Sequence, residues 1–384
     1  MKRIRTVPIL LLLLLPIHSR CDDWGLPGRY LSYGVGARAL AMGNAFVGLA
    51  DDVSSIYWNP SATVLAPHGV SLFYQQLFLD TNYNFIGYVL PPTYLGSVGI
   101  GIVSLNSYNI EGMAETNESS GEFSNMESAL FCSYGYQIDD NLSLGVAAKL
   151  VRQKISSYED LSYGMDVGAL YSILKEKIIL GVNIQNVLSP VILLSEEKDV
   201  FPLSIRSGLA IRLLNNNIIL TTDATKQKYQ SVKLYNGVEF GIFKKLFVRA
   251  GLYNSNQLTS GFGIKLDRFG LDYAFANQGL GNSHKFSINY NFSDFVAKIK
   301  YNIYKGGWEK FLRLSVKTRE NIKRWKLTVL SQKNNIIKIV DGTGAPSEEI
   351  IIKIEESSDK YYNCELLLIS KLGHTKTIHK KIKL

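Results

Sequence analysis

The stretch "NLSLGVAAKLVR", residues 141–152, alternates between apolar and small or polar side chains with a period of two. The same alternation runs through "FGLDYAF" (269–275) and "HKFSINYNF" (284–292), and it dominates residues 69–292. Successive side chains of a β-strand point to opposite faces, so this pattern predicts strands with one apolar and one polar face. An all-β fold is therefore expected.

Such strands fit either a soluble sandwich with an apolar core or a membrane barrel with an apolar outside. The connections favour the barrel, because short turns alternate with longer links such as 106–124 and 185–201. Short turns are expected at 139–141, 174–177, 215–217, 243–245 and 266–268. About fourteen antiparallel strands fit into residues 68–292, and an even number returns the chain to the side on which it began.

The N-terminus has the features of an export signal over residues 1–21. Lys2, Arg3 and Arg5 precede the run "VPILLLLLLPI", which is too short to span a bilayer as a helix. Cleavage after Cys21 would release an exported chain. The protein is therefore expected in the outer membrane of a bacterial cell.

Residues 22–67 lack the alternation and precede the first strand. A barrel of about fourteen strands leaves a lumen that its own side chains do not fill. Small residues at six positions would let a short helix and turn lie close to the wall: Ala37, Ala39, Ala41, Gly43, Ala45 and Gly48. Pro60 should end this element and hold Asn59 out of helical geometry. The segment is therefore expected to be an internal hatch, or plug.

The same segment carries a family resemblance. "GARALAMGNAFVGLADD" followed by "YWNP" resembles the N-terminal signature of the PorV/PorQ branch of the FadL-like outer-membrane proteins, and "GNSHKFSINYNF" is similar to their closing strand. The resemblance implies a fourteen-stranded barrel behind a hatch. It departs after Pro60, where "SAT" replaces the usual Ala-Gly. The residues that would form the hatch or gating motif are Gly36, Arg38, Gly43, Asp51, Asp52, Trp58, Asn59 and Pro60.

The C-terminal part differs in charge. Residues 294–384 contain 19 Lys and Arg against 10 Asp and Glu, which accounts for the whole net charge of +9. A domain boundary is therefore expected near residue 293, with a linker over 293–322 and a small β-sandwich over 323–384. Trp325, the "GTGAP" turn and the closing strands resemble the immunoglobulin-like domain of the FlgD and gliding-motility type. An even strand count would place this domain in the periplasm.

No catalytic or metal-binding motif stands out. The five His residues include only His68 and His284 near the barrel, and no nucleophile motif or metal-ligand spacing accompanies them. "GVGARA" imitates a dinucleotide-binding loop, but no buried strand precedes it. Asp51 and Asp52 are adjacent, so their side chains diverge, and capping or hydrogen bonding inside the plug is the preferred interpretation. The protein is expected not to be an enzyme and to use no cofactor or metal.

Three functions stay open. Resemblance to FadL implies transport of hydrophobic small molecules across the outer membrane, whereas resemblance to PorV implies an accessory role in type IX secretion, as a shuttle or scaffold that holds protein cargo at the cell surface. A structural outer-membrane protein with a partner-binding periplasmic tail is the third. The expected partners are outer-membrane lipid, a hydrophobic ligand or a secreted protein cargo, and a periplasmic protein at the C-terminal domain; nucleic acid is not expected, because the basic residues do not cluster.

Overall fold

The computed structural model describes residues 26–292, apart from 79, 93–94, 114–118, 140, 175–176, 244, 255 and 279–280, and residues 297–383, apart from 307–308, 319–321, 333–334, 347–349, 355–360 and 371–374. The expected signal peptide, residues 1–21, lies outside these ranges. The chain forms two compact units, Met1–Phe292 and Ser293–Leu384, which divide where the charge balance changes. None of the described helices is both long and apolar enough to cross a membrane.

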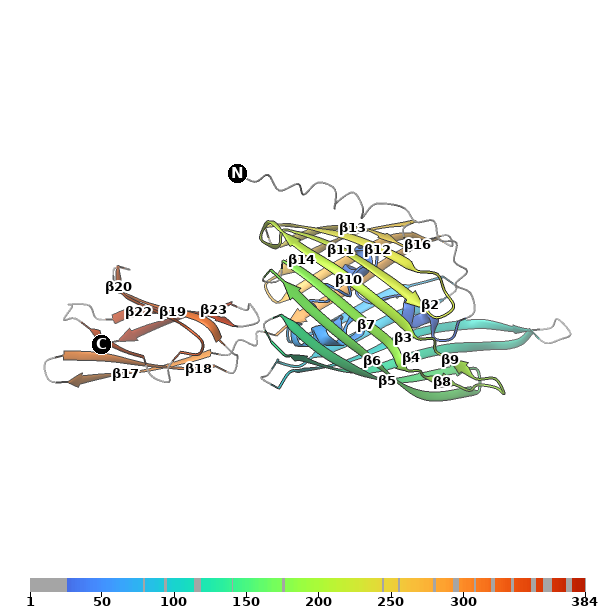
Figure 1. Ribbon diagram of the computed structural model, residues 1–384, viewed down its shortest axis with the longest axis horizontal. Coiled ribbons are helices and arrows are strands. Elements are labelled where there is room, and N and C mark those ends of the chain that lie inside the picture. The colour runs from blue at the N-terminus through green and yellow to red at the C-terminus, as the bar shows by residue number, and fades with distance from the viewer. Residues whose placement is uncertain are drawn as a thin grey trace. The chain divides into compact units, whose positions relative to one another are not determined.

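The first unit is a closed barrel of fourteen antiparallel strands, which confirms the predicted fold (Figure 1). Each strand pairs with its neighbours in the chain, and β1 closes the barrel by pairing with β16. The strands are β1 (Gly69–Gln76), β2 (Thr81–Val89), β3 (Ser97–Met113), β4 (Ser119–Gln137), β5 (Leu142–Ile155), β6 (Tyr158–Ile173), β7 (Ile178–Leu188), β10 (Ser204–Leu213), β11 (Ile218–Gln227), β12 (Lys233–Ile242), β13 (Leu246–Tyr253), β14 (Gln257–Leu266), β15 (Phe269–Gln278) and β16 (Gly281–Asn291).

The period-two pattern places apolar side chains on the outside of the barrel. In β5, Leu144 and Leu150 are exposed while Lys149 is buried on the inner face, and in β16 Phe286 is 50% exposed while Lys285 is 4% exposed. A soluble sandwich has the opposite arrangement, with its large apolar side chains inside. The apolar outside is typical of a wall that faces lipid.

The five predicted short turns all lie between paired strands, and η3 (Leu214–Asn216) occupies one of them. The prediction of a loop over 106–124 is wrong, because β3 and β4 extend into it and stay paired from Ser107 with Asn125 to Met113 with Ser119, across two irregularities. The link at 185–201 begins inside β7 and contains a small hairpin of β8 (Val191–Ile192) and β9 (Asp199–Val200). The β5–β6 connection has only two residues, so connections at the two ends do not alternate strictly in length.

The two ends of the barrel chain meet at the end that carries the five short turns. His68 stacks on Phe292 with ring centroids 4.7 Å apart, and Gly69 pairs with Asn291. We call this the turn end, and the opposite one, with the β3–β4 and β7–β10 connections, the loop end. Both the hatch and the second unit are joined to the barrel at the turn end.

The second unit is a two-sheet sandwich, described here by itself. One sheet has the order β17 (Ala297–Gly306), β18 (Glu309–Thr318), β21 (Ile350–Ile354), and the other β20 (Ile336–Thr343), β19 (Ile322–Leu330), β22 (Tyr361–Ser370), β23 (Thr375–Lys383). Leu312 and Ile352 of the first sheet pack in one core with Leu327 and Leu366 of the second.

The expected linker over 293–322 is wrong, because this part of the chain contains β17 and β18. In "AKIKYNIYKG", residues 297–306, Lys298 and Lys300 alternate with Ala297, Ile299 and Tyr301, which is the period-two pattern of a strand. β17 pairs with β18 from Ala297 and Thr318 to Gly306 and Glu309, and β18 pairs with β21. The sandwich therefore includes the segment that we expected to connect it to the barrel.

Candidate functional site

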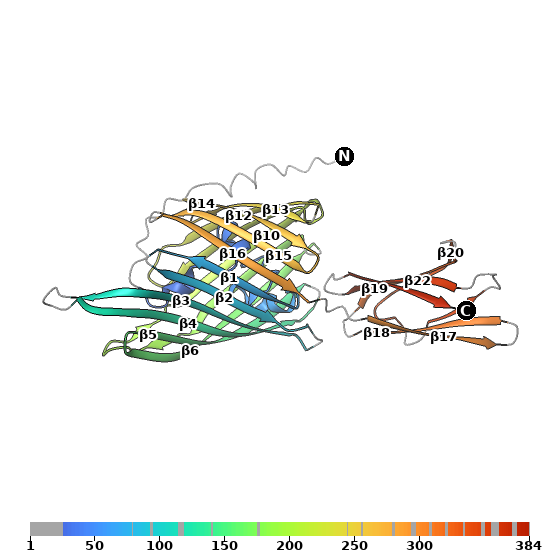
Figure 2. The same ribbon diagram turned by 180° about the vertical axis from the view of Figure 1, so that it is seen from behind.

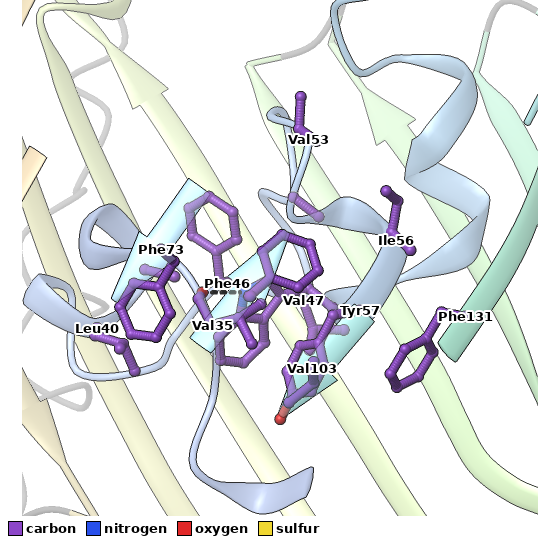
Figure 3. Close-up of a cluster of buried hydrophobic side chains, with 14 of the residues drawn as sticks. Val35, Leu40, Phe46, Val47, Val53, Ile56, Tyr57, Phe73, Val103 and Phe131 are labelled. Carbon is purple, nitrogen blue, oxygen red and sulfur yellow. Dashed lines mark hydrogen bonds between the residues drawn. The ribbon is translucent and has the colours of Figure 1, made fainter. Parts of the chain in front are cut away.

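Residues 26–67, hereafter the hatch, lie inside the barrel (Figure 2). The hatch contains four short helices, where a short helix and turn were expected. They are η1 (Arg29–Ser32), α2 (Ala37–Ala41), α3 (Ser55–Trp58) and η2 (Pro60–Val64). Helix η2 contacts β3 to β6, whereas α2 contacts β13 to β16, so the hatch reaches opposite parts of the wall. Figure 3 shows its apolar side chains packed against Phe73, Val103 and Phe131 of the wall.

Inward-facing glycines let the wall approach the hatch backbone. A Cβ atom built on Gly145, Gly181 or Gly251 would lie within 3.0 Å of backbone atoms of Ser61, Val47 or Gly43, respectively. Several of these glycines are cross-strand partners: Gly135 with Gly145, Gly145 with Gly168, Gly181 with Gly208, and Gly237 with Gly251. A side chain at Gly135, Gly145, Gly181 or Gly251 would collide with main chain, whereas at Gly168 it would meet the side chains of Asn59 and Pro60. The wall is thus shaped around this segment.

A chain of ion pairs holds the turn-end side of the hatch. Arg38 contacts Asp51 at 2.5 Å and binds Glu239 of β12 at 2.8 Å. Glu239 also accepts from Arg249 at 2.6 Å, and Arg249 Nη1 lies 2.7 Å from Asp272. The chain is extended by two further contacts, Arg212 to Asp51 at 3.0 Å and Asn289 to Asp272 at 2.8 Å. Alternating charges therefore connect the hatch to four strands of the wall.

Burial and neighbouring charges shift the pKa values of the Asp52 and Arg38 side chains. Burial raises the pKa of the Asp52 carboxyl, and Arg38 and hydrogen bonds from Ser54 offset part of this effect. For Arg38 burial opposes the charge, but the Asp51 and Glu239 carboxylates raise its pKa well above the usual value. Of the two expected roles of the acidic pair, hydrogen bonding inside the plug is present, since Asp52 Oδ1 accepts from Ser54 N at 2.8 Å, whereas the N-cap of α3 is Ser54 and no side chain caps that helix.

The Asn59-Pro60 turn has the geometry that the sequence predicts. α3 ends at Trp58, and Asn59 is extended, with φ −161° and ψ 108°. Its side chain accepts hydrogen bonds from Ser61 N and Oγ and donates to the carbonyls of Val47 and, in β6, Ala169. Pro60 then starts η2 without needing a backbone donor. This turn therefore joins two parts of the hatch to the wall.

The other predicted motif residues also lie in the hatch. Trp58 is fully buried and donates from Nε1 to the Val35 carbonyl at 2.9 Å. Gly36 and Gly43 have φ values of 86° and 64°, in the region that favours glycine, and Gly43 N donates to Thr259 of β14. All eight predicted residues therefore lie in the part of the hatch that is inside the barrel, between residues 36 and 60. Their role in gating is a proposal.

Sequence reasoning missed the wall residues that hold the hatch. Asp223 of β11 accepts hydrogen bonds from the backbone N–H groups of Phe46 and Val47, both at 2.8 Å, and Glu239 and Arg249 complete the ion-pair chain. Each is a charged residue at an inward position of an alternating strand, as in "LTTDATK" (220–226). This pattern indicates a polar lumen, but it does not identify the hatch groups that each charged side chain contacts.

A pocket lies on the loop-end side of the hatch. It is lined by the hatch residues Gly28, Leu31 and Tyr57 and by inner-face residues of the wall, and the cavity has a volume of about 50 Å³. Its cations are Lys149, Arg206 and Lys233, and its lining includes no carboxylate. Burial raises the pKa of Tyr57 to about 12, so its hydroxyl stays protonated and donates to the Leu31 carbonyl.

The histidine and cysteine side chains near the barrel and in the sandwich core, as far as the structure describes them, show no arrangement of catalytic or metal-binding type. His68 contacts the Tyr88 hydroxyl at 3.0 Å and His284 the Tyr273 hydroxyl at 2.7 Å, both on the exposed side of the barrel. Cys132 is exposed, whereas Cys364 is buried in the sandwich. In the described ranges, no three His, Cys, Asp or Glu side chains are grouped as metal ligands.

The barrel is similar to solved outer-membrane proteins. The CymD monoaromatic hydrocarbon channel matches with a TM-score of 0.51 and 12% identity, over 70% of this chain and 99% of that chain. The Pseudomonas putida toluene transporter TodX matches with a TM-score of 0.50 and 13% identity, over 67% and 99%. A Pseudomonas aeruginosa FadL homologue matches with a TM-score of 0.49 and 12% identity, over 66% and 97%. The chain has a FadL-like barrel fold.

At these identities the likeness concerns the fold alone. No protein-family model and no curated protein matches the chain. The FadL-like part of the expected resemblance is confirmed, whereas membership of the PorV/PorQ branch stays a prediction.

Proposed function

We propose that the protein is an outer-membrane channel of the FadL type, in which the hatch controls the passage of small hydrophobic molecules. The observation that supports this proposal is the close approach of the hatch backbone to the inside of the wall. Ser61 lies against Gly145, and Gly43 lies against Gly251. A segment fitted so closely blocks the lumen at its level, so passage requires it to move or to open a local path.

The outer face supports a membrane location. Large apolar side chains with half or nearly half of their surface exposed surround the barrel, among them Phe240, Phe262, Leu271 and Ile288. In water they would form an apolar surface far larger than monomeric soluble proteins tolerate, whereas in a bilayer they face acyl chains. We place the barrel in the outer membrane, where closed barrels of this kind occur.

The class of permeant is proposed from the proteins that share the fold. CymD is described as a channel for monoaromatic hydrocarbons and TodX as a toluene transporter. A small hydrophobic molecule is therefore the preferred permeant of this chain. A type IX secretion accessory of the PorV/PorQ kind, and a structural barrel with a partner-binding tail, stay predictions to be tested against transport.

The second unit is proposed to be an immunoglobulin-like sandwich in the periplasm. Its first, second and fifth strands form one sheet and its remaining four strands the other, which supports a Greek-key connectivity. The barrel chain ends at the turn end, and short turns are typical of the periplasmic side. A protein partner in the periplasm would then be the natural ligand of this unit.

Uptake of a hydrophobic dye tests the transport proposal. N-phenyl-1-naphthylamine fluoresces when it passes the outer membrane, so cells that express the chain should brighten faster than cells with an empty vector. A variant with the β-barrel intact but the chain ended after Phe292 controls for the second unit and should behave like the full chain. Equal rates with and without the chain would contradict transport of hydrophobic molecules and favour a scaffold role.

A further inference from the structure

A second pocket lies on the outer face of the barrel, over strands β10 to β14, and has a volume of about 390 Å³. The cross-strand pairs Leu209–Thr222, Thr222–Asn236, Asn236–Leu252 and Leu252–Leu258 form one row across these five strands. The side chains of Thr222 and Asn236 are smaller than the leucines on either side of them, so the wall is hollowed between the leucines. We call this the outer pocket.

The outer pocket is separate from the lumen. Thr221 and Asp223, the chain neighbours of Thr222, are buried on the inner face of the wall, so Thr222 points outward. Asn236 lies opposite Thr222 in the register and points the same way. The next outward row completes the lining with Ile211, Leu220, Val238 and Ala250. In the proposed membrane location the pocket therefore faces lipid.

A polar pair lies inside this apolar surface. Thr222 Oγ1 donates to Asn236 Oδ1 at 2.9 Å, and Asn236 Nδ2 donates to no group of the described residues. Both residues lie near the middle of their strands, next to the apolar Leu220 and Val238. An amide that faces hydrocarbon without an acceptor costs free energy, and polar side chains at membrane depth mark functional sites. The pair therefore indicates a ligand that supplies the acceptor.

The hatch supports the wall behind the outer pocket. A Cβ atom on Gly43 would lie 2.7 Å from the carbonyl oxygen of Asn236 and from the backbone nitrogen of Leu252. On the same strands Gly237 pairs with Gly251, and a Cβ atom on Gly237 would lie 2.5 Å from the Met42 carbonyl oxygen. Packed main chain thus backs the base of the pocket, as is usual for preformed ligand sites.

The chemistry of the pocket distinguishes its occupant from bulk lipid. An acyl chain fills the space but offers Asn236 no acceptor, because lipid ester groups lie outside the hydrocarbon core of about 30 Å. A compact lipid-soluble molecule with a carbonyl group meets both requirements. A cavity of roughly 150 Å³ lined by apolar side chains already binds benzene. The outer pocket, at about 390 Å³, has room for two rings and a carbonyl.

We propose that the outer pocket binds a compact lipid-soluble molecule whose carbonyl oxygen accepts a hydrogen bond from Asn236 Nδ2 and whose apolar part contacts the surrounding leucines. The inference rests on the membrane location in the proposed function. It goes beyond that function, because the site lies on the outer face of the wall and not on a path through the lumen.

Photolabelling of the full-length chain in phosphatidylcholine vesicles tests this proposal. The probe is benzophenone, which is lipid-soluble, carries a carbonyl and inserts into nearby C–H bonds under ultraviolet light. Mass spectrometry of peptides should find adducts at Leu209, Leu252 and Leu258 at least tenfold more often than at Leu144 and Leu150, outward leucines of β5. 1-Acetylnaphthalene should suppress the adducts. 1-Ethylnaphthalene, which lacks the carbonyl oxygen, should need a roughly tenfold higher concentration.

Two variants separate the polar pair from the space. Asn236→Leu with Thr222→Val removes the pair and should lower pocket labelling about tenfold. Ala250→Leu keeps the pair but fills the pocket, and should lower labelling as strongly. Asn84→Leu is the matched control, because Asn84 is an outward asparagine of β2, six strands from β12 in the barrel order, and should label like the wild type. Heat-modifiable migration in detergent gels shows that each variant keeps the closed barrel.

Three results would overturn the inference: even labelling of all lipid-facing leucines, equal competition by the two naphthalenes, or unchanged labelling of a folded variant that lacks the polar pair. Photolabelling measures no transport, and dye uptake by cells does not depend on this pocket. Failure of the channel proposal is therefore distinguishable from failure of this site.

Discussion

Arg38 of the hatch and Glu239 of β12 are joined by two hydrogen bonds, Nε to Oε2 at 2.8 Å and Nη2 to Oε1 at 2.9 Å. Glu239 Oε2 also accepts from Arg249 Nε at 2.6 Å, so one carboxylate holds two guanidinium groups. Glu239 is 3% exposed, and a buried pair that loses one partner leaves an uncompensated charge. This pair is the main ionic connection between hatch and wall.

Glu239→Gln should therefore loosen the hatch. The amide keeps the shape of the side chain but leaves Arg38 and Arg249 facing each other without their shared counter-charge, which costs about 3 kcal/mol or more for a buried pair. Limited proteolysis of the purified chain should cut within the hatch faster than in the wild type. Glu159→Gln, at an exposed ion pair, is the control and should be cut at the wild-type rate. Equal cutting of the wild type, Glu239→Gln and Glu159→Gln would refute the role of Glu239 in holding the hatch.

Asp223→Ala should also free the hatch, by a different route. The substitution leaves the N–H groups of Phe46 and Val47 buried without an acceptor, at about 1–3 kcal/mol for each. Amide hydrogen exchange in the hatch should accelerate while exchange in the strands stays slow. Asp341→Ala, on an exposed position of β20, serves as the control. Slow exchange at both hatch amides in Asp223→Ala would show that water or another group satisfies them.

Gly251→Ala tests the close fit of the wall. Its Cβ would lie within 3.0 Å of backbone atoms of Met42 and Gly43, so the hatch must shift. Gly270→Ala is the matched control, because its new atom meets only Asn289 at an ordinary 3.5 Å. We expect Gly251→Ala to yield less heat-modifiable barrel and a protease-sensitive hatch, and Gly270→Ala to resemble the wild type. Identical behaviour of the two variants would mean that the hatch does not depend on the glycine contact.

Residue patterns predicted the barrel but not the partners of the hatch. The alternation at Phe286 and Ile288 depends only on neighbours two residues away, and the lack of alternation around Ala41 and Gly43 identified the hatch. The Arg38–Glu239 pair joins residues 201 positions apart, and its geometry depends on where the hatch lies in the lumen. The error over 293–322 has a similar cause, since the place of β18 in a sandwich depends on Leu312 and Leu314 packing in one core with residues of the second sheet.

The strand count gives a test of orientation. Because both ends of the barrel chain lie at the turn end, a tag after Leu384 should not be labelled on intact cells, whereas a tag between Met113 and Ser119 should be. The measurement is labelling with a membrane-impermeant reagent, before and after the cells are lysed. Labelling of the C-terminal tag on intact cells would place the turn end outside and reverse the proposed orientation.

The central claim is that the hatch closes the lumen, and single-channel conductance in planar bilayers tests it most directly. Asn59→Ala with Pro60→Ala removes the hydrogen bonds of Asn59 to Val47, Ser61 and Ala169 and frees the backbone, while every lipid-facing residue stays in place. We expect the wild type to be closed or nearly so and the double variant to open more often, with the same heat-modifiable barrel. Equal conductance of the two proteins, with both barrels intact, would contradict gating by the hatch and reduce it to a structural filler.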